Sequence, residues 1–222
     1  MALPRLRYAG RVSVMAKQID PKIIEALTEA VREVERCSCA EIVVEIRSRS
    51  GSYGHADARF ASLLAFVALL VLLFSPWPFA AGWVALDVAL VWVVGLYSAR
   101  KFDSARRLMT TERERVNRAR MVASSVFHDR GVANTKDETG VLVYLSTLEG
   151  HIELLADRGV LQAVPSLEWN QLAEKARRHH VTPETLLELV RALTPLLEKH
   201  LPVRDGDVDE LCNVPRFLSD EE

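Results

Sequence analysis

The sequence predicts an α/β protein whose single α/β domain is interrupted by a transmembrane helical hairpin. Three observations support this class. Apolar residues recur at helical and at strand spacing in both flanks of the chain. An almost uncharged stretch separates the flanks, because Asp87 is the only charged residue between Phe60 and Ser98. A length of 222 residues suits one domain with an accessory element.

The first flank predicts a helix and then a strand. Asp20 can cap the helix of residues 20–38, and Pro21 suits its first turn. Residues 40–47, AEIVVEIR, alternate as a strand does, so that Glu41 and Glu45 lie on the face opposite the isoleucines. The segment before this helix, residues 1–19, has arginines but no apolar run after them, so we expect a tail rather than a secretory signal, with the true start at Met1 or Met15.

The middle of the chain predicts a helical hairpin in a membrane. Residues 48–59 are expected to form a loop that leads to two apolar runs, residues 60–74 and 79–97, which the prolines of SPWP separate. A spanning helix needs about 20 residues; the second run supplies them, whereas the first is short. Neither run has the polar stripe of a helix in a soluble protein. A buried pair in a soluble core and a shallow hairpin that does not cross are the alternatives.

The positive residues predict the orientation of this hairpin. They occur on both flanks and are absent from the turn, where Trp77 suits a membrane interface. These residues are Arg47, Arg49, Arg59, Arg100, Lys101, Arg106 and Arg107. We therefore expect both flanks on the cytoplasmic side of the membrane. Three cysteines, Cys37, Cys39 and Cys212, lack the spacing of a disulfide framework, which agrees with that compartment.

The second flank predicts a helix and a β-hairpin. Thr111 and Glu114 have capping-box spacing at the start of the helix, and Gly131 ends it. Two β-rich runs, residues 140–145 and 151–156, then flank the turn STLEG.

Two further helices close the second flank, over residues 167–180 and 182–201, and Pro195 is expected to kink or divide the last one. Glu153, in the β-hairpin before them, is expected to face solvent. The acidic end of the chain has few structural signals. The expected organisation is a tail (1–19), a first domain part (20–58), the hairpin (59–98), a second domain part (99–202) and an acidic tail (203–222).

Two stretches of this sequence resemble the TPM domain family: the strand CAEIVVEIR, and the hairpin TGVLVYLSTLEGHIELLADRGV with the VPSLEW that follows it. The resemblance covers residues 20–201 and includes bacterial members in which a two-helix membrane segment interrupts the domain. It implies an α/β/α sandwich with a small central sheet. It also implies divalent-metal binding and weak phosphatase activity in some members, and assembly, repair or receptor-accessory roles in others. Many members carry a signal peptide and lie outside the cytoplasm. This chain departs from that pattern in its expected cytoplasmic location, so the extracytoplasmic roles carry over poorly to it.

Four acidic residues are candidate ligands for Ca²⁺ or Mg²⁺, which take several oxygen ligands. They lie at strand ends and could meet at one edge of the sheet: Glu41, Asp137, Glu138 and Asp157. The resemblance supports Glu41 and Asp157 most directly, because both lie in the matching motifs. The alternative interpretation is structural, with Glu41 and Glu45 on a solvated strand face and Asp157 capping a turn.

Other chemistries find little support in the sequence. The net charge is −2 and no nucleic-acid motif is present, so a nucleic-acid partner is not expected. No nucleophile elbow or Gly-rich phosphate loop occurs, and DGDVDE (residues 205–210) lacks the Gly and Glu that an EF-hand loop requires. His179 and His180 are interpreted as cations at a helix end.

Three functions remain open at this point. The favoured one is a membrane-anchored binding, assembly or accessory module with a protein partner in the membrane, with or without a divalent metal. The second is a divalent-metal phosphatase that uses Glu41 and Asp157. The third assigns the function to the hairpin itself through Asp87, since an acid inside a membrane usually faces protein or water.

Overall fold

The structure is a computed structural model that describes residues 20–77, 79–178, 182–204, 211 and 214–218. The chain divides into two compact units, one formed by Met1–Ser50 with Ala119–Glu222 and the other by Gly51–Arg118. The first, called the sheet unit, contains all the named strands. The second, called the hairpin unit, contains the long apolar helices. The predicted N-terminal tail lies outside the described residues.

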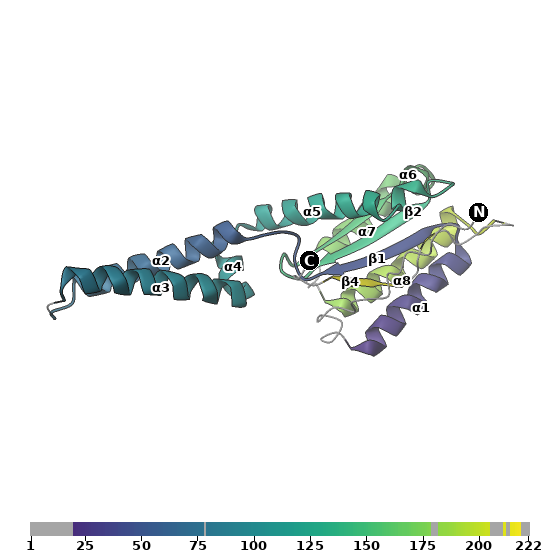
Figure 1. The fold of residues 1–222 in the computed structure, drawn as a ribbon. Coiled ribbons are helices and arrows are strands. Elements are labelled where there is room, and N and C mark those ends of the chain that lie inside the picture. Colours follow the sequence, from purple (N-terminus) through teal and green to yellow (C-terminus); the bar gives the residue numbers. More distant parts are fainter. Residues whose placement is uncertain (1–19, 78, 179–181, 205–210, 212–213, 219–222) are drawn as a thin grey trace, which may run out of the picture. The chain divides into compact units, whose positions relative to one another are not determined.

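The sheet unit is built on a mixed four-stranded sheet with the order β3-β2-β1-β4 (Figure 1). Its strands are β1 (Glu41–Arg47), β2 (Gly140–Ser146), β3 (His151–Ala156) and β4 (Arg216–Leu218). β1 pairs in parallel with β2 and with β4, whereas β2 and β3 form the predicted antiparallel hairpin. The short β4 was missed by the sequence analysis, which gave its segment to an acidic tail. Its three residues, RFL, complete the sheet beside β1.

Helices cover both faces of this sheet, which confirms the predicted α/β/α layering. On one face the main core joins the sheet to α1 (Pro21–Cys37), α7 (Ser166–Arg178) and α8 (Pro183–His200), with the short α6 (Arg158–Ala163) at its margin. On the other face lies a smaller core that includes Val43, Leu142 and Tyr144 from the sheet.

The smaller core is closed by α5 (Glu112–Asp129), through its residues from Ala119 onward, and by a 3₁₀ turn, η2 (Val132–Asn134). Gly131 separates the two in the left-handed conformation, with φ of 72°, as its predicted role at the helix end requires. The Thr111 side chain accepts a hydrogen bond from Glu114 N at 3.3 Å, so the predicted cap of this helix is present.

Local signals explain where the outer helices begin and end. Asp20 accepts a hydrogen bond from Lys22 N at the start of α1, and Thr182 forms a capping box with Thr185 at the start of α8. α8 runs through Pro195 to His200 as one helix. Of the two predicted effects of Pro195, a kink or a division, the division was therefore wrong. Leu193 and Leu197, which flank the proline, are fully buried, and this packing offsets the lost backbone hydrogen bond.

The hairpin unit contains α2 (Gly54–Leu73), α3 (Ala81–Lys101), α4 (Asp103–Met109) and the first turns of α5. α2 and α3 approach closely because their contact is made of small residues. A Cβ placed on Gly95 would lie 3.0 Å from Ala61 Cα, and Trp92 Nε1 donates a hydrogen bond to Ser62 Oγ at 3.3 Å. Small residues of this kind allow membrane helices to associate.

Both apolar helices are long enough to cross a membrane, with 20 and 21 residues. The first is longer than the sequence analysis allowed, because α2 begins at Gly54 within the segment predicted to be a loop. Asp57 in its first turn suits the positive end of the helix dipole and makes an ion pair with Arg106. α4, which carries Arg106, was not predicted either.

Candidate functional site

The structure places two of the four predicted acidic residues, Glu41 and Asp157, at the same edge of the sheet. Glu41 pairs with Gly140 in the register of β1 and β2, and Asp157 N donates a hydrogen bond to Gly140 O at 2.8 Å. Glu41 and Asp157 therefore lie on either side of Gly140, about 10 Å apart across two strand spacings. Strand alternation places all three on the face that η2 covers.

Gly140, which lies between the two acids in the sheet, is packed against the backbone of η2. A Cβ at this position would lie 2.1 Å from the carbonyl oxygen of Val132, so only glycine admits the backbone of η2 here. This carbonyl therefore lies over Gly140, the position between Glu41 and Asp157 in the sheet. The sequence analysis placed the two acids at one edge but could not foresee the backbone between them.

The two acids differ in how their oxygens are satisfied. Glu41 is buried, and its Oε2 accepts a hydrogen bond from Leu211 N at 3.2 Å. Asp157 caps α6 by accepting from Arg158 N at 2.7 Å. Its other oxygen, Oδ2, is enclosed without a hydrogen-bond partner among the described residues. An enclosed carboxylate oxygen of this kind is costly unless a donor or a cation approaches it.

The other two predicted ligands belong to the loop before β2. Both are exposed, and Asp137 makes an ion pair with Arg204 at 3.4 Å. Glu138 has a φ of 56°, and its carbonyl accepts a hydrogen bond from Gly159 N. Among the described residues no group of three or more His, Cys, Asp or Glu side chains is arranged to hold a metal ion. The four-residue metal site therefore stays a prediction.

A buried polar network lies towards the opposite end of the strands, on the same face. Ser50 Oγ is 2.7 Å from Tyr144 Oη and donates to Ser146 Oγ at 2.7 Å. Glu149 accepts from Ser50 N at 2.8 Å and from the Ser146 hydroxyl. Burial raises the pKa of Tyr144 to about 12, so its hydroxyl stays protonated in this network. Nothing in the sequence pattern distinguished these residues from an ordinary strand end.

Glu153 and Glu45 extend this polar face, and the expectation that they face water was wrong. Glu153 is 4% exposed and Glu45 is fully buried. Glu45 accepts from Arg47 at 2.6 Å and from Arg130 at 2.9 Å. Alternation correctly put both glutamates on the face opposite the main core, but helix α5 covers that face as well.

Arginine and histidine side chains compensate the buried charge of Glu153. Arg177 donates to it at 2.8 Å, and Arg120 lies 3.4 Å away. His151 Nε2 is 2.6 Å from the second carboxylate oxygen. Burial alone would raise the pKa of Glu153, but the hydrogen bonds from His151 and Arg177 outweigh it and leave the pKa lowered. Because every member has partners, this network is typical of a structural core.

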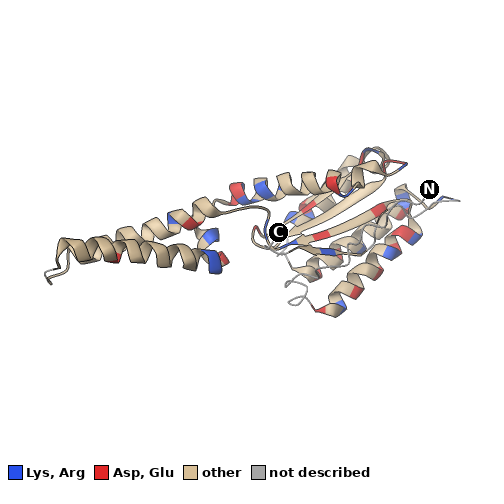
Figure 2. Cartoon of the chain, viewed as in Figure 1, with Lys and Arg blue, Asp and Glu red and all other residues tan. Residues whose placement is uncertain are grey.

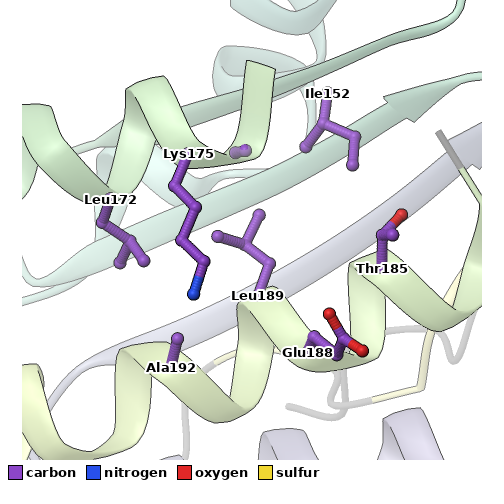
Figure 3. Close-up of a pocket in the computed structure, with 8 residues that line it drawn as sticks. Ile152, Leu172, Lys175, Thr185, Glu188, Leu189 and Ala192 are labelled. Carbon is purple, nitrogen blue, oxygen red and sulfur yellow. The ribbon is translucent and has the colours of Figure 1, made fainter. Parts of the chain in front are cut away.

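A hollow on the other side of the sheet is amphipathic (Figure 3). It lies between α7 and α8, with Leu172 and Leu189 as apolar walls and Ile152 of β3 behind them. Lys175 and Glu188 bring opposite charges to the same hollow. Such a surface suits contact with a side chain of a protein partner.

The remaining candidates of the sequence analysis are placed as follows. Neither Cys37 nor Cys39 takes part in a disulfide among the described residues. Asp87 is half-buried in α3. Cys212, His179, His180 and residues 205–210 lie outside the described residues.

Comparison with known proteins supports the fold. No family model and no curated protein matches the chain. A similar solved structure is the NMR structure of BA42 protein from the psychrophilic bacterium Bizionia argentinensis. The two chains are 15% identical, with a TM-score of 0.50, and the match covers 90% of this chain and 94% of that one. At this identity the likeness extends to the fold alone.

Proposed function

We propose that this chain is a membrane-anchored binding or assembly module of TPM type. In this proposal the hairpin unit lies in a bacterial inner membrane and the sheet unit faces the cytoplasm. The observation that carries it is the exposed apolar surface of α2 and α3. Only 22% of the most apolar 18-residue stretch of α2 is buried, and only 6% of that of α3. Leu73, for example, is 70% exposed. A core helix of a soluble protein would bury such side chains.

Two further features support a binding role for the sheet unit. Its buried network around Tyr144, Glu45 and Glu153 is satisfied by hydrogen bonds and ion pairs within the unit, which favours a rigid scaffold. Its amphipathic hollow between α7 and α8 offers a partner both apolar contact and the opposite charges of Lys175 and Glu188. We therefore propose a protein partner in or at the membrane, with this hollow as one point of contact. Crosslinking from a photoreactive residue at Leu172 in intact membranes would identify that partner.

Membrane insertion is tested by the distribution of the full chain in cells. We expect it in the membrane fraction, resistant to extraction with alkaline carbonate. Val67 and Leu90 are exposed apolar residues on α2 and α3. The double variant Val67→Arg/Leu90→Arg should lose this resistance, because an arginine at the centre of a spanning helix costs about 2.5–3.5 kcal/mol. The matched variant Val67→Ala/Leu90→Ala should keep it. Wild-type protein that stays soluble and monodisperse without detergent would refute the anchor.

The second candidate function, a divalent-metal phosphatase at the acidic edge, is favoured by the enclosed Oδ2 of Asp157. Glu41 and Asp157 supply two carboxylates, and a Ca²⁺ ion takes six to eight oxygens. Any cation there would need further oxygens, from backbone carbonyls or water. Hydrolysis of a phosphate ester that requires Mg²⁺ or Ca²⁺ and disappears in Asp157→Asn would establish this alternative.

A further inference from the structure

The short helix α4 is fastened to the start of α2 by a buried ion pair. Arg106 donates to both carboxylate oxygens of Asp57, at 2.9 and 3.2 Å. The two side chains are only 6% and 5% exposed. Thr110 Oγ1 donates to the carbonyl of Arg106 at 2.8 Å and secures the end of the same helix. α4 is therefore a fixed part of the hairpin unit.

Arg106 points into the hairpin unit, whereas other basic and apolar side chains of α4 and of the neighbouring helix ends are exposed to the outside. The exposed members, which we call the collar, lie near the polar ends of α2 and α3 and on α4: Arg59, Arg100, Lys101, Phe102, Arg107 and Leu108. Figure 2 shows Lys and Arg gathered at the end of α3 and on α4. Acids are fewer here, since Asp57 is taken up by Arg106 and the exposed Asp103 lies 3.7 Å from the same guanidinium.

We infer that the collar binds the phosphate headgroups of anionic phospholipids. This inference rests on the proposed membrane anchor. α3 ends at Lys101 directly after its apolar stretch, so the collar lies at the level of the headgroups when that stretch is in the membrane. Phe102 is 57% exposed and Leu108 is 72% exposed, a degree of exposure that suits the boundary between headgroups and acyl chains. Cations that immediately follow a membrane helix meet the negative surface of anionic lipids. Charge complementarity thus selects an anionic lipid over a zwitterionic one.

The test uses the purified full chain in nanodiscs that contain equal amounts of phosphatidylglycerol and phosphatidylcholine. After mild detergent extraction, native mass spectrometry counts the lipids that each protein retains. We compare wild type with Arg100→Gln/Lys101→Gln/Arg107→Gln. The matched control neutralises three exposed cations of the sheet unit that lie outside the hollow between α7 and α8, Lys22, Arg32 and Arg191. Circular dichroism confirms that each variant is folded.

We expect wild type and control to retain phosphatidylglycerol preferentially, and this preference to fall roughly tenfold or more in the collar variant. The preference should also weaken in 0.5 M salt, because exposed charges are screened. Equal retention of the two lipids by wild type, or an unchanged preference in the collar variant, would overturn the inference while the anchor stands. Failure of the wild type to insert into pure phosphatidylcholine bilayers would overturn both.

Discussion

Asp57 and Arg106 form a bidentate ion pair that is buried although 49 positions separate the two residues in sequence. The pair joins the first turn of α2 to α4 and so holds α4 against the polar end of the apolar hairpin. Its burial means that neither charge can be satisfied by water if the other is removed. The hairpin unit therefore depends on a contact between residues far apart in sequence, which local sequence patterns cannot predict.

Removing one member of this pair should destabilise the hairpin unit. We expect Asp57→Ala to cost about 3–5 kcal/mol, because it leaves the Arg106 charge buried and unpaired. The measurement is thermal unfolding of the full chain in detergent. Asp103→Ala is the matched control and should cost less than about 1 kcal/mol, since the Asp103 side chain is 67% exposed and lies 3.7 Å from Arg106. The apolar double replacement Asp57→Leu/Arg106→Met should recover most of the loss, and failure to do so would assign the pair another role.

Gly140 should tolerate no side chain. Gly140→Ala would bring a Cβ within 2.1 Å of the Val132 carbonyl, and we expect a loss of about 3 kcal/mol or more in stability. Gly54 is the control, because a Cβ there meets nothing within 4 Å and alanine is the better helix former. Unfolding of both variants is followed by far-ultraviolet circular dichroism. Equal stabilities would show that η2 does not lie over the acidic edge as described.

Stability should depend on Glu153 at acid pH. Its folded-state pKa is lowered from the ordinary value of 4.5, so its contribution is complete above pH 4.5 and is lost as the pH falls through the folded pKa. We therefore expect the melting temperature of wild type to fall more steeply below pH 4.5 than that of Glu153→Gln. Glu188→Gln, at an exposed position, should follow the wild-type profile. Parallel curves for wild type and Glu153→Gln would contradict this account.

A divalent cation at the acidic edge should bind through Asp157. Calorimetric titration of Ca²⁺ and Mg²⁺ into the detergent-solubilised full chain is expected to show weak binding, of the order of 10⁻⁴–10⁻³ M. Asp157→Asn should abolish it, whereas Asp129→Asn, at an exposed position on α5, should not. Absence of binding in wild type would leave the edge as a structural cap and the sheet unit as an interaction surface.

Local pattern was sufficient for much of the fold. The spacing of apolar residues predicted α1, β1, the β2–β3 hairpin and α5, because each buries one face and its caps are near in sequence. What the sequence could not show depends on partners far along the chain. Glu45 and Glu153 were assigned to the correct face, but their burial follows from α5, which arrives from another part of the sequence. The start of α2, all of α4, and β4 likewise depend on distant contacts.

The candidate site was predictable only at the level of strand ends. Strand order was enough to bring Glu41 and Asp157 to one edge of the sheet. The intervening Val132 carbonyl and the enclosed oxygen of Asp157 are properties of packing, and no residue pattern encodes them. The network around Tyr144 was missed for the same reason, because its serines and Glu149 come together only when the strands pair.

In the proposed arrangement the hairpin crosses a membrane and leaves the sheet unit on the cytoplasmic side. Single-cysteine variants test it directly: one keeps only Cys37, which is partly exposed on α1, and the other carries Trp77→Cys in the exposed turn as its sole cysteine. Both are treated with a membrane-impermeant maleimide in spheroplasts. The account predicts labelling at position 77 in intact spheroplasts and labelling of Cys37 only after lysis. Labelling of Cys37 in intact spheroplasts would contradict the proposed orientation. Labelling of position 77 only after lysis would show that the turn does not reach the outer side of the membrane.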